Sequence, residues 1–181
     1  MARLDYQPQD LAEPQDIVNA IRARRGGKLI LLDRMLLHSP AFAQGWSSLL
    51  RAVRQELGLD PKLRELAIVV VAVLNHAAFE HQQHAPEFLK AGGTEAQLAA
   101  LTTPLDAVER LDLFDPTERA VLRLTLEMTG TVLVDKATFA AAAQALDHDQ
   151  SMVELVGTIA TYNMVSRFLV ALAIEPADEA N

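Results

Sequence analysis

The chain has 181 residues, with 16 basic and 24 acidic side chains and a formal net charge of −8. Half of the residues are hydrophobic and 22% are charged, which is typical of a soluble globular domain. An acidic chain lacks the basic stripe that a phosphate backbone requires, so we expect no nucleic-acid partner. The absence of cysteine excludes disulfides, thiolate nucleophiles and dithiol redox chemistry.

No segment has the pattern of a signal peptide or a membrane span. The first ten residues contain no apolar run, and the longest apolar run, 66–74, has nine residues. A membrane-spanning helix needs about 18 or more. We therefore expect a cytoplasmic protein with no membrane partner.

Start and stop signals for helices recur along the whole chain. Pro14, Asp60-Pro61, Thr94 with Gln97, Asp115-Pro116 with Glu118, Asp135 and Asp149 each mark a helix start. The expected helices cover 14–25, 28–38, about 40–57, the segment from 60 through the apolar run, 79–91, a short stretch after Thr94, 116–130, 135–146 and 149–174. Residues 104–114 are predicted to form a loop.

These signals predict an all-α bundle of about eight helices with no sheet. The run LAIVVVAVL (66–74) could also form a buried strand, because periodicity does not separate the two for so short a segment. A lone strand is not stable, and no partner strand is evident, so we expect a buried helix. We expect one domain over 1–181, with an N-terminal helical extension, 1–39, and a frayed tail, 175–181.

A polar cluster follows the apolar run directly and contains three of the five histidines. Its members are Asn75, His76, Glu80, His81 and His84. Three interpretations remain open. Glu80 and His84 can form an acid/base pair, since residues four apart share a helix face. His76, Glu80 and His84 can instead ligate a metal, or the cluster can be a solvated helix face.

Glu65 lies just before the apolar run and is expected to be at least partly buried, so it needs a partner or a raised pKa. On one straight helix Glu65 and His84 would be about 28 Å apart. They can meet only if the chain folds back near Asn75. Arg64 is the simplest alternative partner, although adjacent helical residues do not face each other.

The last predicted helix carries a second polar patch, Thr161, Tyr162, Asn163 and Arg167, within an otherwise apolar sequence. Asn163 and Arg167 are four apart and can share a face. An arginine in such surroundings is seldom buried alone, so we expect Arg167 to pair with a carboxylate; binding an anionic ligand or reaching solvent at an interface are the alternatives.

The stretch RELAIVVVAVLNHAAFEHQQHAPEFLKAGGTEAQLAAL resembles the signature region of the carboxymuconolactone decarboxylase and AhpD-like (alkylhydroperoxidase D) superfamily. The segments DPTERAVLRLTLEMTG and TYNMVSRFLVALAI resemble the second half of its longer members. In AhpD-type peroxidases a Glu, a Cys-x-x-Cys pair and a His recur at fixed spacing. In this chain the Glu of that motif corresponds to Glu65 and the His corresponds to His84. The two cysteine positions correspond to Ala77 and Glu80. Because both cysteines are missing, dithiol peroxidase chemistry is excluded.

The decarboxylase branch of that family has a Glu-x-x-x-His pair, which Glu80 and His84 match. The resemblance implies an AhpD-like all-α fold, cofactor-free chemistry on a small carboxylated lactone, and a homo-oligomer, trimeric or hexameric. On this hypothesis His84 is the general acid or base, Glu80 orients it, and Glu65 is a second carboxylate. Arg167, Asn163 and Asn75 are expected to bind the substrate. The alternatives are a non-catalytic oligomeric binding scaffold and a metalloenzyme using His76, Glu80 and His84.

Overall fold

The computed structural model describes residues 1–180, and the side chains of residues 1–178. Within this range the chain forms ten α-helices and one 3-10 helix, with no strand, which confirms the all-α prediction. The helices form two compact units. The first contains Met1–Glu56 together with the segment from Ala171 onward, and the second contains Leu57–Val170.

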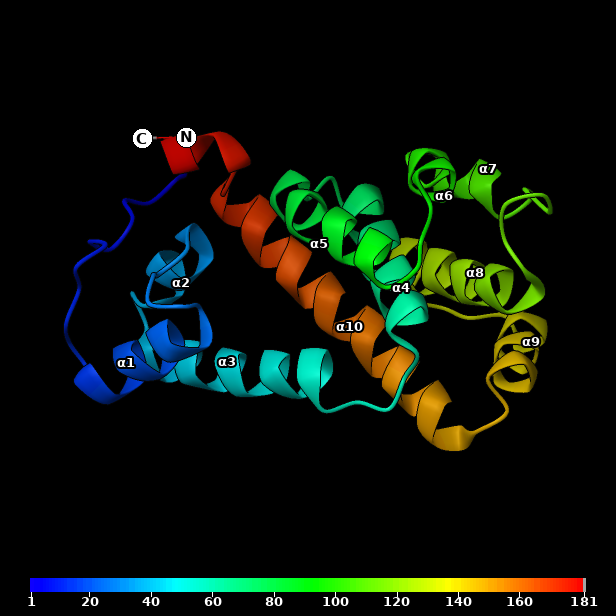
Figure 1. Ribbon diagram of the computed structural model, residues 1–181, viewed down its shortest axis with the longest axis horizontal. Coiled ribbons are helices and arrows are strands. Elements are labelled where there is room, and N and C mark those ends of the chain that lie inside the picture. The colour runs from blue at the N-terminus through cyan, green and yellow to red at the C-terminus, as the bar shows by residue number, and fades with distance from the viewer. Residues whose placement is uncertain (181) are drawn as a thin grey trace. The chain divides into compact units, whose positions relative to one another are not determined.

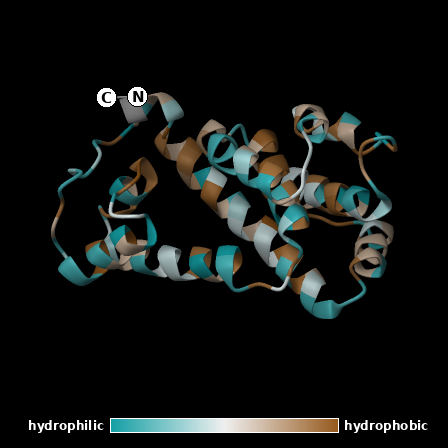
Figure 2. Ribbon diagram, viewed as in Figure 1, coloured by the Kyte–Doolittle hydropathy of each residue, from teal (hydrophilic) through white to brown (hydrophobic). Residues whose placement is uncertain are grey.

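The first unit is built on three helices near the N-terminus, coloured blue to cyan in Figure 1. They are α1 (Gln15–Arg24), α2 (Leu31–Leu36) and α3 (Pro40–Gln55). Both α1 and α2 pack against α3. Val18, Ile21 and Trp46 are buried in this unit, and Figure 2 shows hydrophilic and hydrophobic residues alternating around α3.

The C-terminal segment of the same unit ends in a 3-10 helix, Pro176–Ala180, within the predicted frayed tail. The Asp178 carboxylate accepts a hydrogen bond from the Tyr6 hydroxyl at 2.8 Å, and it lies 3.6 Å from the N-terminal amine of Met1. Asn181, the last residue of the predicted tail, lies outside the described residues.

The second unit contains the remaining seven α-helices. They are α4 (Pro61–Leu74), α5 (Ala78–Lys90), α6 (Glu95–Ala100), α7 (Pro104–Ala107), α8 (Pro116–Gly130), α9 (Lys136–Leu146) and α10 (Asp149–Leu172, which continues two residues into the first unit). α4 packs against α5 and α8, and α9 packs against α8. Helix α4 is therefore the centre of this unit.

The ambiguous apolar run is a helix, α4, and its residues 66–72 are buried on all sides. Burial on every side explains why its apolar residues show no helical periodicity. The Asp60 carboxylate caps its start by accepting hydrogen bonds from the backbone N–H groups of Lys62 and Leu63.

Two further helix starts also have the predicted chemistry. Thr94 and Gln97 form a capping box before α6, and Asp115 and Glu118 form one before α8. The prediction of a loop over 104–114 is wrong in its first part, where α7 begins at Pro104. A proline in the first helical turn is itself a start signal, because its missing N–H has no partner to lose there.

A tight reversal joins α4 to α5. The Ala77 N–H donates to the Ala72 carbonyl at 2.8 Å, and the His76 N–H donates to the Val73 carbonyl at 3.1 Å. These two bonds define a Schellman motif, in which the residue after the helix adopts the left-handed conformation. Here that residue is His76, with φ +54°. The reversal returns α5 along α4.

By length and composition, α10 is apolar enough to cross a membrane, but half of its most apolar window is buried inside the protein. The core helix of a globular protein has the same properties. Leu155, Ile159, Val165 and Leu169 are among its buried side chains. The expected absence of a membrane partner stays a prediction.

The end of α5 provides a test of the packing in the second unit. A Cβ atom on Gly93 would overlap the ring of Phe88, which is fully buried. We expect Gly93→Ala to lower the free energy of unfolding by about 1–3 kcal/mol, because a packed ring has no room to move. The measurement is urea unfolding followed by circular dichroism.

Gly157→Ala is the matched control. Gly157 lies in the middle of α10, is exposed, and has no atom near its missing Cβ. This change should raise the free energy of unfolding by about 0.5–1 kcal/mol. Equal effects of the two substitutions would contradict the packing described for Phe88.

Candidate functional site

A buried histidine lies between two carboxylates in the second unit. His84 Nδ1 is 2.7 Å from Glu65 Oε2, and His84 Nε2 is 3.3 Å from Glu80 Oε2. Their exposed fractions are 2% for His84, 4% for Glu65 and 5% for Glu80. The Tyr162 ring meets the imidazole edge to face, with ring centres 5.0 Å apart. We call Glu65, His84 and Glu80 the relay.

Two helices and the reversal between them position the relay. Glu65 lies on α4, whereas Glu80 and His84 lie four residues apart on α5 and share one face. The chain folds back at 75–77, as a contact between Glu65 and His84 requires. Glu80 is in the first turn of α5, where the partial positive charge of the helix end favours a carboxylate.

Arg64 also contacts Glu65, which sequence spacing argued against. Its Nε is 3.2 Å from Glu65 Oε1, while Oε2 accepts from His84. The expectation that neighbours on a helix do not pair is therefore wrong here. The long arginine side chain can curl back over its own helix, whereas the spacing rule describes where Cβ atoms point.

The contacts of the relay shift the pKa values of His84 and Glu65 in opposite directions. Burial alone would lower the pKa of His84, but hydrogen bonds to Glu65 and Glu80 and the charges of both carboxylates outweigh it and raise that pKa. Burial would raise the pKa of Glu65, but hydrogen bonds and charges from His84 and Arg64 outweigh it and lower that pKa. Each shift thus favours the charged form of its group, the imidazolium of His84 and the carboxylate of Glu65.

A second polar network joins the end of α4 to α10. The Asn75 side chain donates to Asn163 Oδ1 at 3.0 Å and to Ser166 Oγ at 2.7 Å. The Asn163 amide in turn donates to Thr129 Oγ1 and to the Ile159 carbonyl, both at 3.0 Å. Asn75 and Asn163, two of the predicted substrate-binding residues, are thus in contact. Both the oxygen and the nitrogen of the Asn163 side chain are hydrogen-bonded to other protein groups.

Arg167 does not form the predicted ion pair. Its Nη1 donates to the backbone carbonyl of Asn163 at 2.9 Å and to the side-chain Oδ1 at 2.6 Å. Among the described residues no carboxylate lies within ion-pair distance of it. Arg167 is an exposed residue, so it does not need the carboxylate that a buried arginine would require.

The predicted metal set is not brought together. Glu80 and His84 lie on one face of α5, but His76 precedes that helix, in the left-handed turn, and is exposed. Over residues 1–180, no group of three or more His, Cys, Asp or Glu side chains has the arrangement of a metal site. The spacing argument is wrong because it assumed one continuous helix through all three residues.

An open hollow of about 380 Å³ lies over the reversal between α4 and α5. It is lined by Ala72, Val73, His76, Ala77, Ala78 and His81. Ala77 is the residue directly before α5, and Glu80 lies in the first turn of that helix. This hollow was not predicted from the sequence, although the small residues at 77 and 78 were an available signal for it.

The chain is similar to one sequence family and to several solved structures. Residues 40–127 match the profile of the family described as "Carboxymuconolactone decarboxylase family". No protein with a curated description matches the sequence of this chain.

Three solved structures share the fold at low sequence identity. An uncharacterized peroxidase-related protein from Silicibacter sp. TM1040 has a TM-score of 0.77 and 17% identity, with 95% of this chain and 90% of that chain covered. A cysteine-to-alanine variant of the debrominase Bmp8, bound to 2,3,4-tribromopyrrole, has a TM-score of 0.78 and 14% identity, with 99% and 97% covered. An alkylhydroperoxidase AhpD core protein from Ralstonia eutropha JMP134 has a TM-score of 0.67 and 21% identity, with 98% and 93% covered. The predicted AhpD-like fold is confirmed.

The opposite pKa shifts predict how stability depends on pH. The stabilisation that comes from charged His84 is complete when the pH is below the ordinary pKa of histidine, 6.5. It is lost as the pH rises through the raised pKa of His84. The stabilisation that comes from ionised Glu65 is complete when the pH is above the ordinary pKa of glutamate, 4.5. It is lost as the pH falls through the lowered pKa of Glu65. The free energy of unfolding should therefore be greatest between about pH 4.5 and 6.5, where both contributions are complete.

The measurement is denaturant unfolding across pH, comparing the wild type with His84→Gln. The stability advantage of the wild type should shrink as the pH rises through the raised pKa of His84. His148→Gln, at an exposed histidine, should give a profile parallel to that of the wild type. A His84→Gln profile that is also parallel would show that the relay is not charged in this way.

Proposed function

We propose that this chain, whose residues 40–127 match the carboxymuconolactone decarboxylase family, is a cofactor-free acid/base catalyst. Its substrate is a small carboxylated molecule of the lactone type, and its reaction is a decarboxylation or a related lyase step. The observation that carries this proposal is the relay, in which each nitrogen of a buried imidazole faces a carboxylate.

The two carboxylates have different roles in this proposal. Glu65, fixed by Arg64, accepts from His84 Nδ1 and holds the ring in one orientation. His84 Nε2 then faces Glu80, so a proton can pass between these two groups. The same division occurs in Ser-His-Asp triads, where a buried carboxylate orients the histidine while the other nitrogen moves the proton.

In this proposal the substrate binds in the hollow over the reversal between α4 and α5. Ala77 lines this hollow and directly precedes α5, and Glu80 is the member of the relay that lies in the first turn of that helix. In the family resemblance, these are the two positions of the missing cysteines. A carboxylate therefore occupies the position of a thiol, and proton transfer is the chemistry that it supports.

Decarboxylation needs the proton that the relay can supply. The bond between the substrate carbon and its carboxylate breaks, CO₂ leaves, and the electron pair remains on carbon as an enolate-type anion. A proton from His84, passed through Glu80, then adds to that carbon, and a solvent proton restores the imidazolium. Burial favours this step, since electrostatic stabilisation is greater away from water.

Arg167 supplies the positive charge that an anionic substrate requires. It is the exposed cation of the polar network, and two hydrogen bonds from Nη1 to Asn163 hold it. Because Asn163 is saturated by protein partners, it positions Arg167, and Asn75 fixes Asn163 in turn. The substrate-binding role of these asparagines is thus mainly indirect.

We further propose a cytoplasmic homo-oligomer, a trimer or a hexamer, which the family resemblance implies. Exposed apolar side chains of the second unit support an assembly, since exposed apolar surface often marks contact sites. Leu105, Leu133 and Val153 are each more than two-thirds exposed.

A non-catalytic binding scaffold is the second candidate, and the burial of the relay favours it. His84 has only 2% of its surface exposed, and both of its nitrogens have protein partners. A histidine of this kind can serve stability alone. Turnover measurements separate the two candidates.

The first test is CO₂ release from 4-carboxymuconolactone by purified protein. His84→Ala and Glu80→Gln should each lower kcat by about 100-fold to 10,000-fold, the usual contribution of general acid/base catalysis. Circular dichroism should show a retained helical fold, and His148→Ala should keep wild-type turnover.

Unchanged turnover in both relay variants would refute the assignment of the relay as the catalytic group. No turnover by the wild type on this and related carboxylated lactones would favour the binding scaffold. Elemental analysis of the same protein batch tests the metalloenzyme interpretation, which requires stoichiometric metal.

Arg167 provides a separate prediction about binding. Arg167→Gln should raise KM by about tenfold, equal to about 1.4 kcal/mol, and leave kcat within a factor of two to three. Arg123→Gln removes an exposed arginine from α8 and is the control, with KM unchanged. An equal loss of kcat would instead place Arg167 at the reacting carbon.

A further inference from the structure

We propose that the first unit contains a second ligand site, a pocket between α1 and α3 that binds a small organic anion with an apolar body. Arg24 and Arg51 recognise its acidic group. This site is formed by residues of the first unit only, and it shares no residue with the relay.

The pocket has the size and the mixed lining of a small-molecule site. Its volume is about 430 Å³, within the range of ligand pockets of about 300–1,000 Å³. On the α1 side it is lined by Ile17, Ala20 and Ile21. On the α3 side the lining is polar and consists of Gln44, Ser47, Ser48, Arg51 and Gln55.

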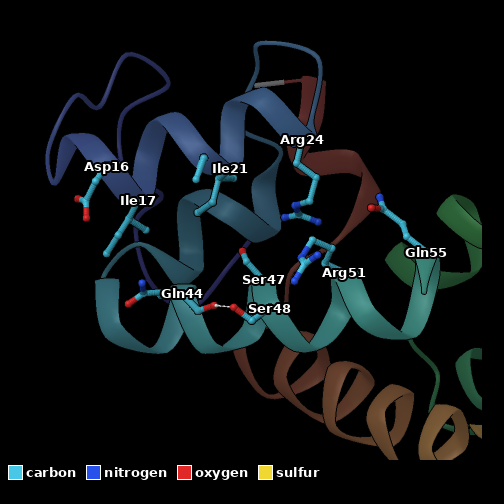
Figure 3. Close-up of a pocket in the computed structure, with 10 residues that line it drawn as sticks. Asp16, Ile17, Ile21, Arg24, Gln44, Ser47, Ser48, Arg51 and Gln55 are labelled. Atoms are coloured by element: carbon cyan, nitrogen blue, oxygen red, sulfur yellow. Dashed lines mark hydrogen bonds between the residues drawn. The ribbon is translucent and has the colours of Figure 1, made fainter. Parts of the chain in front are cut away.

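The charges are separated along the pocket. Figure 3 shows Arg24 of α1 and Arg51 of α3 at one end, whereas Asp16 and Gln44 lie at the other end. The apolar side chains of Ile17 and Ile21 lie along α1 between the two ends. A molecule with one acidic group and one apolar body matches this arrangement in a single orientation.

The cationic end has more positive charge than its protein partners neutralise. Asp33 is buried and serves both Arg24, at 3.4 Å, and Arg25, at 3.1 Å. One of its oxygens also accepts from the backbone N–H of Ile30 at 3.2 Å. One carboxylate is therefore shared between two guanidinium groups, in a chain whose total charge is −8.

Arg24 is held at this end in a partly desolvated state. Its side chain has an exposed fraction of 17%, and its Nε is buried without a hydrogen-bond partner among the described residues. Burial, together with the charges of Arg25 and Arg54, lowers its pKa, against the opposing effect of Asp33. A second anion beside Arg24 would relieve this imbalance.

Arg51 is the adaptable member of the pair. Its side chain is 57% exposed and forms an ion pair with Glu56, which is itself about half exposed. An exposed ion pair of this kind contributes little stability, so a ligand anion can compete for the guanidinium. Arginine suits this role because its planar fork matches a carboxylate with two parallel hydrogen bonds.

The experiment uses octanoate as the probe, with octanol and octylamine as matched neutral and cationic compounds of equal chain length. Isothermal titration calorimetry on the full chain should show saturable binding of octanoate and much weaker binding of the other two. Arg51→Gln and Arg24→Gln should each raise the dissociation constant by about tenfold, whereas Arg22→Gln, on the same helix but outside the pocket, should leave it unchanged.

Two further variants separate shape from charge. Ala20→Phe adds a ring to an exposed residue of the lining and should abolish binding without changing any charge. Glu56→Gln removes the competitor of Arg51 and should tighten binding by several-fold. Arg51 and Glu56 are both largely exposed, so these variants remain informative if Arg24→Gln fails to fold.

Three outcomes would overturn the proposal. One is the absence of saturable octanoate binding to the wild type at millimolar concentration. The second is equal binding of octanoate and octanol, since the cations would then recognise nothing. The third is a wild-type oligomer that Ala20→Phe converts to monomer, which would make this surface an interface between copies of the chain.

Discussion

Much of the second unit depends on how one buried imidazole is paired with two carboxylates. Taking an imidazolium out of water is costly, and a carboxylate on each ring nitrogen compensates for that cost. Glu65 comes from α4, while Glu80 and His84 come from α5. The two helices must therefore keep one register, because losing either carboxylate would leave a buried charge incompletely paired.

The reversal at His76 is what makes this register possible. A left-handed residue ends α4, and two backbone hydrogen bonds close the turn before α5 begins. The same turn places Asn75 against α10, where it donates to Asn163 and Ser166. Thus one short segment connects the relay, the hollow and the polar network, and three helices converge on it.

The two units have contrasting chemistry. The relay pairs an imidazole with two carboxylates in a buried setting, so the imidazole nitrogens have partners within the protein. The pocket between α1 and α3 differs, because its Arg24 shares one buried carboxylate, Asp33, with Arg25. The first arrangement suits proton transfer, and the second suits capture of an anion from solution.

Local signals in the sequence predicted the helices well. Capping residues act through hydrogen bonds to backbone groups two or three positions away, so Asp60, Thr94 and Asp115 could be identified without knowing the fold. The i, i+4 spacing likewise placed Glu80 beside His84. Grouping His76 with them failed because spacing rules hold only within one continuous helix.

Contacts between residues on separate helices could be identified only from the tertiary structure. The sequence by itself determined an all-α chain, a cysteine-free site and the need of Glu65 for a partner. Only the tertiary structure decided that this partner is His84, that Arg167 reaches solvent, and that α1 and α3 enclose a pocket. The physical reason is range: caps and spacings act over a few residues, whereas partners for buried charges are chosen by the packing of elements far apart in sequence.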